Sequence, residues 1–289
     1  SRDLRPAAQH DQDVRAAVFA PDGALLSGGV DQRLIEHGRE PQRGSFARST
    51  PLAGSIVGVA VSSDGLMAAA ATSEGLVYVF PRKESADGPA IRARRLDVKI
   101  GAMAFRPGTQ DVYLGCGDGR VRVVGPADKA EFYDLEGGHR LEVKGLAFDA
   151  TGSRLVSAGA DNTVMVRTFA VDGKQAVAAP FRLKPPVDGF FGHWHACAFS
   201  PDGKKIAAGA LSAMVAIWDA ETGDALHVLR GHDGSVEGVA WSPDGARLLS
   251  TSADGHVCVW SAATGDLLAR VRAGPLTIYT AAYSPDGLS

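Results

Sequence analysis

The chain has 289 residues, a formal net charge of −3 and 45% hydrophobic residues. This composition excludes a disordered or collagen-like chain. The near-neutral charge argues against nucleic acid as a partner, because a nucleic-acid footprint usually needs a clear basic excess. No run of 18 apolar residues predicts a membrane span. The 35 glycines and 15 prolines together are 50 of the 289 residues. This share is above the average of roughly 12% for the two residue types, which indicates many turns between short strands.

A turn of the Ser-Pro-Asp-Gly type recurs along the whole chain. Its proline position falls at Pro21, Ser63, Pro107, Ala150, Pro201, Pro243 and Pro285, with spacings of 42, 44, 43, 51, 42 and 42 residues. The regular spacing indicates one repeated structural unit. The single long interval locates an insertion at 171–192.

Each repeat has the same internal order of elements. An alternating apolar run comes first, such as Val14–Phe19, Val143–Phe148 or Val236–Trp241. A turn with Asp-Gly follows, then a second run, a second turn and a third run that ends at an aromatic position. With a fourth run, four short strands fill about 42 residues. A lone four-stranded meander has two exposed edges and little core, whereas radial packing of such units protects the edges, and the 40-to-45-residue period is that of β-propellers.

The residues of the sixth repeat are similar to those of the WD-repeat β-propeller family. The resemblance rests on Gly231-His232, the turn at 242–245, Asp254 and Trp260, and on Trp218-Asp219 in the fifth repeat, and it covers nearly all of the chain. It implies an all-β fold of four-stranded antiparallel blades. It also implies a structural hydrogen-bonded network of His, Ser, Asp and Trp in each blade. The complete set here is His232, Ser250, Asp254 and Trp260, and partial sets are His10, Ser27 and Asp31, then His139, Ser157 and Asp161, and Trp218 alone.

The blade count follows from the repeats. One propeller domain spans 1–289, with repeat units at 10–51, 52–95, 96–138, 139–189, 190–231 and 232–273 and a partial unit at 274–289. We therefore expect a seven-bladed-type propeller with an incomplete last blade, to which 1–9 would give the outermost strand and 276–283 the innermost strand. The missing initiator methionine and the end within a turn favour a fragment of a longer chain that carries further, covalently linked domains.

Three patterns resemble chemical sites, and each has a structural interpretation that we favour. The His, Ser and Asp sets resemble a hydrolase triad, but they recur in three repeats and no serine lies in a Gly-x-Ser-x-Gly turn. His193, His195 and Cys197 resemble metal ligands, yet no carboxylate lies near them. The glycine-rich Gly115–Gly119 precedes a strand, so a phosphate-binding loop is unsupported. No catalytic residue, metal or cofactor is expected.

The cysteines and the arginines also have structural interpretations. Cys116, Cys197 and Cys258 are too few and too far apart for a disulfide framework or a zinc site. We interpret them as small buried hydrophobic residues, which favours a reducing, cytoplasmic compartment. Basic residues are expected on outermost strands, where charge prevents edge-to-edge pairing, or on a surface for an acidic partner; they are Arg39, Arg43, Arg48, Arg82, Lys83, Arg92, Arg94 and Arg95.

Two groups of residues are candidates for contact with a partner. Phe190, Phe191 and Trp194 follow the stiff Pro185-Pro186 segment in the insertion, and clustered aromatics are typical binding anchors. The alternative is that they fill gaps in a blade that lacks its His and Asp. Arg15, Lys144, His195 and Glu237 share one position in the repeat, so they are predicted to surround the mouth of the central channel.

These features favour a non-catalytic scaffold that binds a protein or peptide of unknown identity. One alternative is an enzyme or small-ligand-binding propeller with a site in the central channel, which would use the four channel residues. Another alternative is a structural spacer inside a larger protein.

Overall fold

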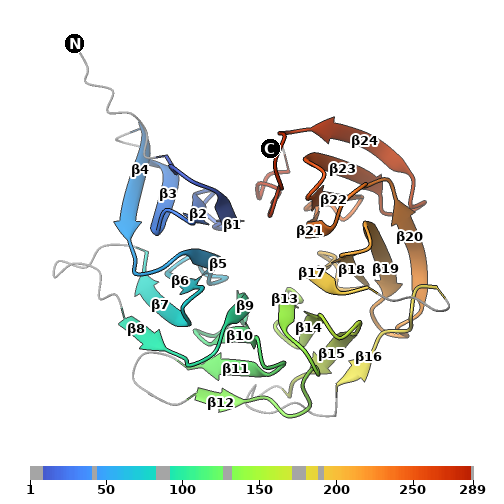
Figure 1. Cartoon of the computed structure of the whole chain (residues 1–289), viewed down its shortest axis with the longest axis horizontal. Coiled ribbons are helices and arrows are strands. Elements are labelled where there is room, and N and C mark those ends of the chain that lie inside the picture. The colour runs from blue at the N-terminus through green and yellow to red at the C-terminus, as the bar shows by residue number, and fades with distance from the viewer. Residues whose placement is uncertain are drawn as a thin grey trace.

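The chain folds entirely into β-strands and connecting loops in the part that its computed structural model describes, which is 9–40, 44–82, 92–125, 132–170, 180–187 and 192–287. Within these ranges, six four-stranded sheets stand around a central axis (Figure 1). Neighbouring strands in each sheet are antiparallel and consecutive in sequence. The fold is therefore a β-propeller, and each sheet is one blade.

Blades 1 to 3 comprise β1 (Val14–Phe19), β2 (Leu25–Gly29), β3 (Arg33–Glu40), β4 (Gly44–Pro51), β5 (Ile56–Val61), β6 (Met67–Thr72), β7 (Leu76–Pro81), β8 (Arg92–Arg95), β9 (Ile100–Phe105), β10 (Val112–Cys116), β11 (Val121–Val124) and β12 (Phe132–Asp134). Blades 4 to 6 comprise β13 (Val143–Phe148), β14 (Arg154–Gly159), β15 (Val164–Thr168), β16 (Phe181–Arg182), β17 (Trp194–Phe199), β18 (Lys205–Ala210), β19 (Met214–Asp219), β20 (Ala225–Arg230), β21 (Val236–Trp241), β22 (Arg247–Ser252), β23 (His256–Ser261) and β24 (Leu267–Arg272). The first strand of each blade faces the axis and the fourth lies outermost (Figure 1).

The expected seven-bladed ring with an incomplete last blade is wrong, because the described residues form six blades. Residues 275–287 follow β24 and form no strand. Their turn still forms, with Ser284 Oγ 2.5 Å from an Asp286 carboxylate oxygen, and the Ile278 amide donates to the Ser252 carbonyl at 3.1 Å. A strand requires a ladder of hydrogen bonds to a neighbour, so the alternating apolar pattern of 276–283 is not sufficient alone. The proposed outermost strand at 1–9 lies almost entirely outside the described residues.

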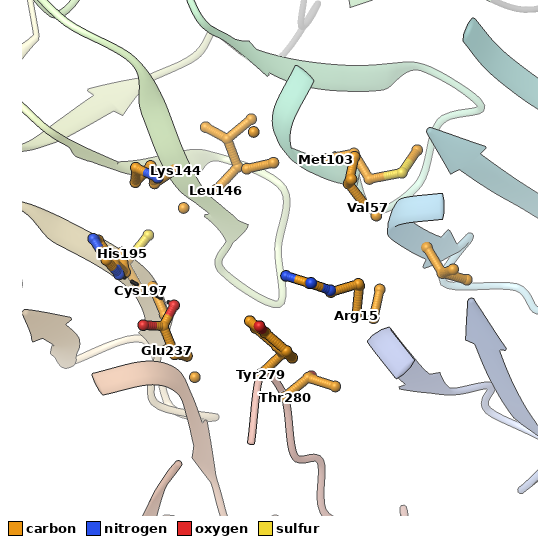
Figure 2. A pocket seen from close by; sticks show the side chains of 18 of the residues that line it. Arg15, Val57, Met103, Lys144, Leu146, His195, Cys197, Glu237, Tyr279 and Thr280 are labelled. Carbon is orange, nitrogen blue, oxygen red and sulfur yellow. Dashed lines mark hydrogen bonds and ion pairs between the residues drawn. The ribbon is translucent and has the colours of Figure 1, made fainter. Parts of the chain in front are cut away.

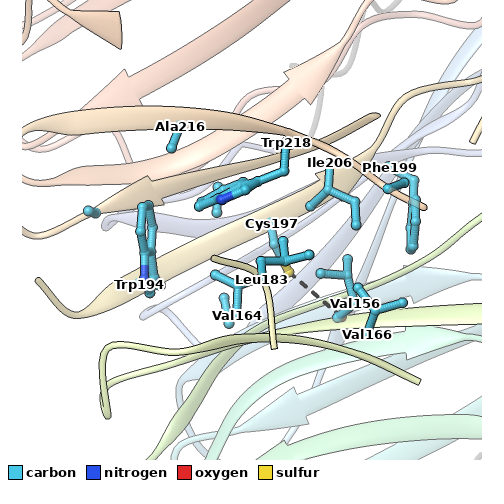
Figure 3. Close-up of a cluster of buried hydrophobic side chains, with 14 residues drawn as sticks. Val156, Val164, Val166, Leu183, Trp194, Cys197, Phe199, Ile206, Ala216 and Trp218 are labelled. Carbon is cyan, nitrogen blue, oxygen red and sulfur yellow. Dashed lines mark hydrogen bonds between the residues drawn. The ribbon is translucent and has the colours of Figure 1, made fainter. Parts of the chain in front are cut away.

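Five buried apolar clusters hold successive blades together. Each cluster combines side chains from two adjacent blades, so the core lies between the sheets. Figure 3 shows the cluster between blades 4 and 5, in which Val156 and Val166 lie near Phe199, and Val164 lies near Trp194. In the part of the chain that the structure describes, no such cluster joins blade 6 to blade 1, and 276–283 lie there instead (Figure 1).

The three cysteines lie within these clusters, as predicted. Cys116, Cys197 and Cys258 are all buried and free. Burial raises the pKa of the Cys197 thiol, and it raises the pKa of Cys258 to about 11. Both thiols are therefore protonated and unreactive at neutral pH.

A β-bulge recurs at the second residue of every innermost strand. The pairing of β1 with β2 jumps from Val14 to Ala16, and the other five innermost strands skip the equivalent residue. The six skipped residues are Arg15, Val57, Gly101, Lys144, His195 and Glu237. A bulge leaves its residue out of the ladder and changes the direction of its side chain. This repeated irregularity positions the candidate site.

Candidate binding site at the central channel

The six bulge residues line one cavity on the propeller axis. The cavity has a volume of about 570 Å³ and is lined by the innermost strands of all six blades and by residues 279–281. Figure 2 shows Arg15, Lys144, His195 and Glu237 arranged around it, together with Tyr279. The structure thus brings together the four channel residues that the repeat pattern singled out.

One side of the cavity is polar and its charged groups are paired. His195 Nδ1 lies 3.2 Å from a Glu237 carboxylate oxygen. The Lys144 ammonium lies 3.6 Å from the Glu142 carboxylate, and Lys99 lies 2.9 Å from the same carboxylate. Arg15 stacks over the ring of Tyr279, with 3.9 Å between the guanidinium carbon and the ring centroid.

The opposite side of the cavity is apolar. Val57 and Val59 from β5, Met103 from β9 and Leu146 from β13 line it, and Figure 2 shows Val57 and Met103 across from the His195–Glu237 pair, with Leu146 beside Lys144. The bulge residue of β9 is Gly101, and a Cβ atom there would lie 2.4 Å from the Val143 carbonyl oxygen. Glycine is therefore required where β9 approaches β13. The channel thus presents charged and apolar side chains side by side.

The electrostatics of the channel favour an ionised Glu237. Burial alone would raise its pKa, but hydrogen bonds from His195 and Ser235 and the charge of Lys144 outweigh burial and lower the pKa below its ordinary value. Among the described residues, no group of three His, Cys, Asp or Glu side chains could hold a metal ion. The arrangement offers charge recognition beside an apolar wall.

The His, Ser and Asp residues of the blade networks are brought together in three blades. In blade 6, His232 lies 3.1 Å from Asp254 and 2.8 Å from Ser250, whose hydroxyl accepts a 2.8 Å bond from the Trp260 indole. The same contacts, each 2.9 Å, join His10 to Asp31 and Ser27 in blade 1 and His139 to Asp161 and Ser157 in blade 4. In blade 5 the Trp218 indole donates to the Lys184 carbonyl at 2.8 Å. All of these groups lie away from the channel.

Arg167 replaces the tryptophan of this network in blade 4. It is fully buried on β15, where its guanidinium donates to Ser157 at 3.1 Å and to the Gly137 carbonyl. It therefore supplies the donor that the Trp260 indole supplies in blade 6. Burial lowers the pKa of Arg167 to about 10, so it stays charged at neutral pH.

The buried histidines make stability depend on pH. Burial lowers the pKa of His139 and of His232, and it outweighs the opposing effect of Asp161 and Asp254. The unfolded chain then takes up these protons at a higher pH than the folded chain, so acid favours unfolding. We expect the free energy of unfolding to fall as the pH drops below about 6.5, by at most ~1.4 kcal/mol per pH unit for each histidine.

Urea unfolding midpoints between about pH 7.5 and about pH 5.5 measure this slope. The double variant His139→Gln/His232→Gln should have a smaller slope, and a variant of the exposed His193 should not. Equal slopes in all three proteins would contradict the assignment. A separate loss, below about pH 3.9, is expected from Asp161 and Asp254, whose pKa values are lowered in the folded chain.

Of the three predicted aromatic anchors, the structure describes Trp194 alone. Phe190 and Phe191 lie outside the described residues. Trp194 is buried, and its ring packs edge-to-face on Trp218 with centroids 5.2 Å apart while its indole donates to the Asn162 carbonyl. The prediction of Trp194 as a surface anchor is therefore wrong, because Trp194 begins β17 and fills the space between blades 4 and 5.

Arg82 also differs from its predicted place on an outer strand. Its guanidinium is buried and bonds Glu36 at 2.6 Å, the Gly65 carbonyl at 2.8 Å and Asp22 at 3.1 Å. It therefore connects blade 2 to blade 1. Arg94 and Arg95 do lie on the outermost strand β8, whereas Lys83, Arg43 and the side chains of Arg39, Arg48 and Arg92 lie outside the described residues.

Among the channel residues that sequence reasoning missed are Tyr279, Lys99 and Glu142. Tyr279 follows Glu237 by 42 residues, so the repeat spacing itself could have identified it. Lys99 and Glu142 directly precede the innermost strands β9 and β13, a position that the repeat comparison did not include.

The fold and the channel define a β-propeller with a polar site on its axis. Three segments, 132–167, 184–219 and 223–261, match the family described as WD domain, G-beta repeat. These three segments thus match WD40 repeats, as the resemblance implied. A crystal structure of the WD40 β-propeller domain of Doa1 superimposes with a TM-score of 0.78 over 97% of this chain and 90% of that one, at 18% identity, which shows the fold alone.

Curated relatives share parts of the chain. Periodic tryptophan protein 2 of Arabidopsis thaliana is 24% identical over 224 residues, which are 77% of this chain and 24% of the relative. The human U5 small nuclear ribonucleoprotein 40 kDa protein is 46% identical over 43 residues, which are 15% of this chain and 12% of the relative. The matched segment therefore spans about a quarter, or less, of each of these relatives.

The described part of the chain contains no helix with the length and apolar character to cross a membrane.

Proposed function

We propose that this chain is a non-catalytic scaffold that binds a protein or peptide segment at its central channel. The observation that carries the proposal is the set of bulges, because five of the six blades aim a side chain into one cavity of about 570 Å³. β-Bulges are more frequent next to active sites than elsewhere, because a bulge changes the direction of a side chain. An apolar wall facing a few oriented polar groups is the usual composition of a binding pocket.

The relatives support the same class of function. The name of the U5 40 kDa protein assigns that protein to a ribonucleoprotein particle, and by analogy we propose that this chain also works within a larger assembly, as a part of a longer protein. The three cysteines are buried and form no disulfide, which supports a reducing compartment. We propose that this compartment is the cytoplasm.

The test compares two lysine variants of the full chain. Lys144 lines the channel, whereas Lys184 lies outside it and pairs with the exposed Asp224. Lys144→Ala and Lys184→Ala each remove one ion-paired lysine. We expect Lys144→Ala to reduce the recovery of specific partners from lysate, quantified by mass spectrometry, about tenfold or more, and Lys184→Ala to leave it unchanged.

Equal recovery by wild type and both variants would contradict a channel site.

A small-molecule thermal-shift screen tests the second candidate function, a small-ligand or enzymatic channel, which the cavity volume also permits. A compound that stabilises wild type but not Lys144→Ala would favour that candidate.

A further inference from the structure

Within the described lining of the channel, both carboxylates already have partners. Glu142 lies between Lys99 at 2.9 Å and Lys144 at 3.6 Å. Glu237 accepts hydrogen bonds from Ser235 and pairs with His195 at 3.2 Å. Neither carboxylate pairs with Arg15.

Arg15 is oriented into the channel without an acidic partner there. Its nearest carboxylate is that of Asp13, half exposed to solvent and 3.5 Å from one guanidinium nitrogen. Its Nε is buried and has no hydrogen-bond partner among the described residues. The Tyr279 ring lies beneath the guanidinium (Figure 2), and this contact orients the guanidinium and reduces the conformational entropy that ligand binding would cost.

We propose that Arg15 recognises a carboxylate of an acidic peptide in this channel, and that the adjacent apolar residue of the peptide packs on Val57, Met103 and Leu146. The guanidinium fork matches the two oxygens of a carboxylate. This inference rests on the proposed function and specifies its ligand. The class of peptide follows from this lining. An acidic side chain of the peptide would pair with Arg15, and an apolar side chain next to it would pack on the apolar residues.

The charge balance favours a carboxylate over a phosphate ester. Three fixed cations, Arg15, Lys99 and Lys144, and two carboxylates, Glu142 and Glu237, line the channel. With His195 counted as neutral, one positive charge is in excess. A single carboxylate compensates this charge. A phosphate ester carries −1.5 to −2 charges at neutral pH and would add uncompensated negative charge beside Glu142 and Glu237.

The experiment selects ligands from a random heptapeptide phage library on the full chain. The recovered peptides are then synthesised and their Kd values are measured by fluorescence polarisation. Arg15→Gln removes the fork, Arg15→Lys keeps the charge alone, and Arg95→Gln removes an arginine that is 69% exposed on β8 as a matched control. Urea unfolding of each variant reports whether it is folded.

We expect the recovered peptides to be enriched in Asp or Glu next to an apolar residue. Arg15→Gln should weaken their binding about tenfold or more, Arg15→Lys should weaken it less, and Arg95→Gln should leave it unchanged. Replacement of the acidic residue of the peptide by the corresponding amide, Asn or Gln, should raise the Kd as much as Arg15→Gln does. Tighter binding of a phosphoserine version would assign the site to phosphate and overturn the carboxylate.

Different outcomes would overturn the role of Arg15 and the peptide-binding function of the channel. Peptides that lack acidic residues but lose affinity in Lys144→Ala would overturn the role of Arg15 and leave the channel scaffold intact. Acidic peptides that bind wild type and Arg15→Gln equally would also overturn it. Recovery of no peptide by wild type would contradict the peptide-binding function itself.

Discussion

Replacement of Trp260 by alanine is expected to lower the free energy of unfolding by about 3–5 kcal/mol. The side chain is 1% exposed and packs in the cluster between blades 5 and 6 with Trp241 and Leu248. Its indole N–H donates to Ser250, which also contacts His232. Truncation therefore removes apolar contacts, leaves a cavity and deprives the Ser250 hydroxyl of a donor, and urea unfolding measures the sum.

Two further variants control this measurement. Asp254→Ala should cost about 1–3 kcal/mol, because it leaves His232 and the Asp233 amide without their acceptor. Leu268 is 54% exposed on β24, so Leu268→Ala should change stability by at most ~0.5 kcal/mol. A Trp260→Ala protein as stable as the Leu268→Ala protein would contradict the structural role of the network.

The repeat made most of the fold predictable. Each tight turn needs a residue with positive φ, and the glycines Gly23, Gly65, Gly203 and Gly245 supply it with φ values from 68° to 81°. Because these positions recur at a nearly fixed interval, they mark the strands between them. Periodicity thus carried more information than the propensity of any single residue.

The blade count was not predictable by the same argument. An apolar alternation fixes which face of a segment is buried, but pairing needs a neighbouring strand. Residues 276–283 place Tyr279 in the channel and against Arg15, as an innermost strand would. The described chain pairs them with no second strand, so sequence alternation and strand formation differ at this place.

The channel residues were predictable and the aromatic anchor was not. Arg15, Lys144, His195 and Glu237 share a repeat position, and a shared position means a shared direction. The same comparison applied to Trp194 gives five residues that begin an innermost strand: Ile56, Ile100, Val143 and Val236 are buried, and Val14 alone is exposed. The position of Trp194 after the insertion led to the opposite expectation, although its place in the repeat already indicated a core residue.

Trp194→Ala is therefore expected to destabilise the fold by about 3–5 kcal/mol and to leave the channel intact in the molecules that remain folded. Trp194 is 1% exposed and contacts Trp218 in the cluster between blades 4 and 5 (Figure 3). Leu211 is 49% exposed near it, and Leu211→Ala is the control with little expected effect. Urea unfolding gives the stability loss, and the affinity of the folded fraction for channel peptides should match wild type. Full stability with weakened binding would instead restore Trp194 as a surface anchor.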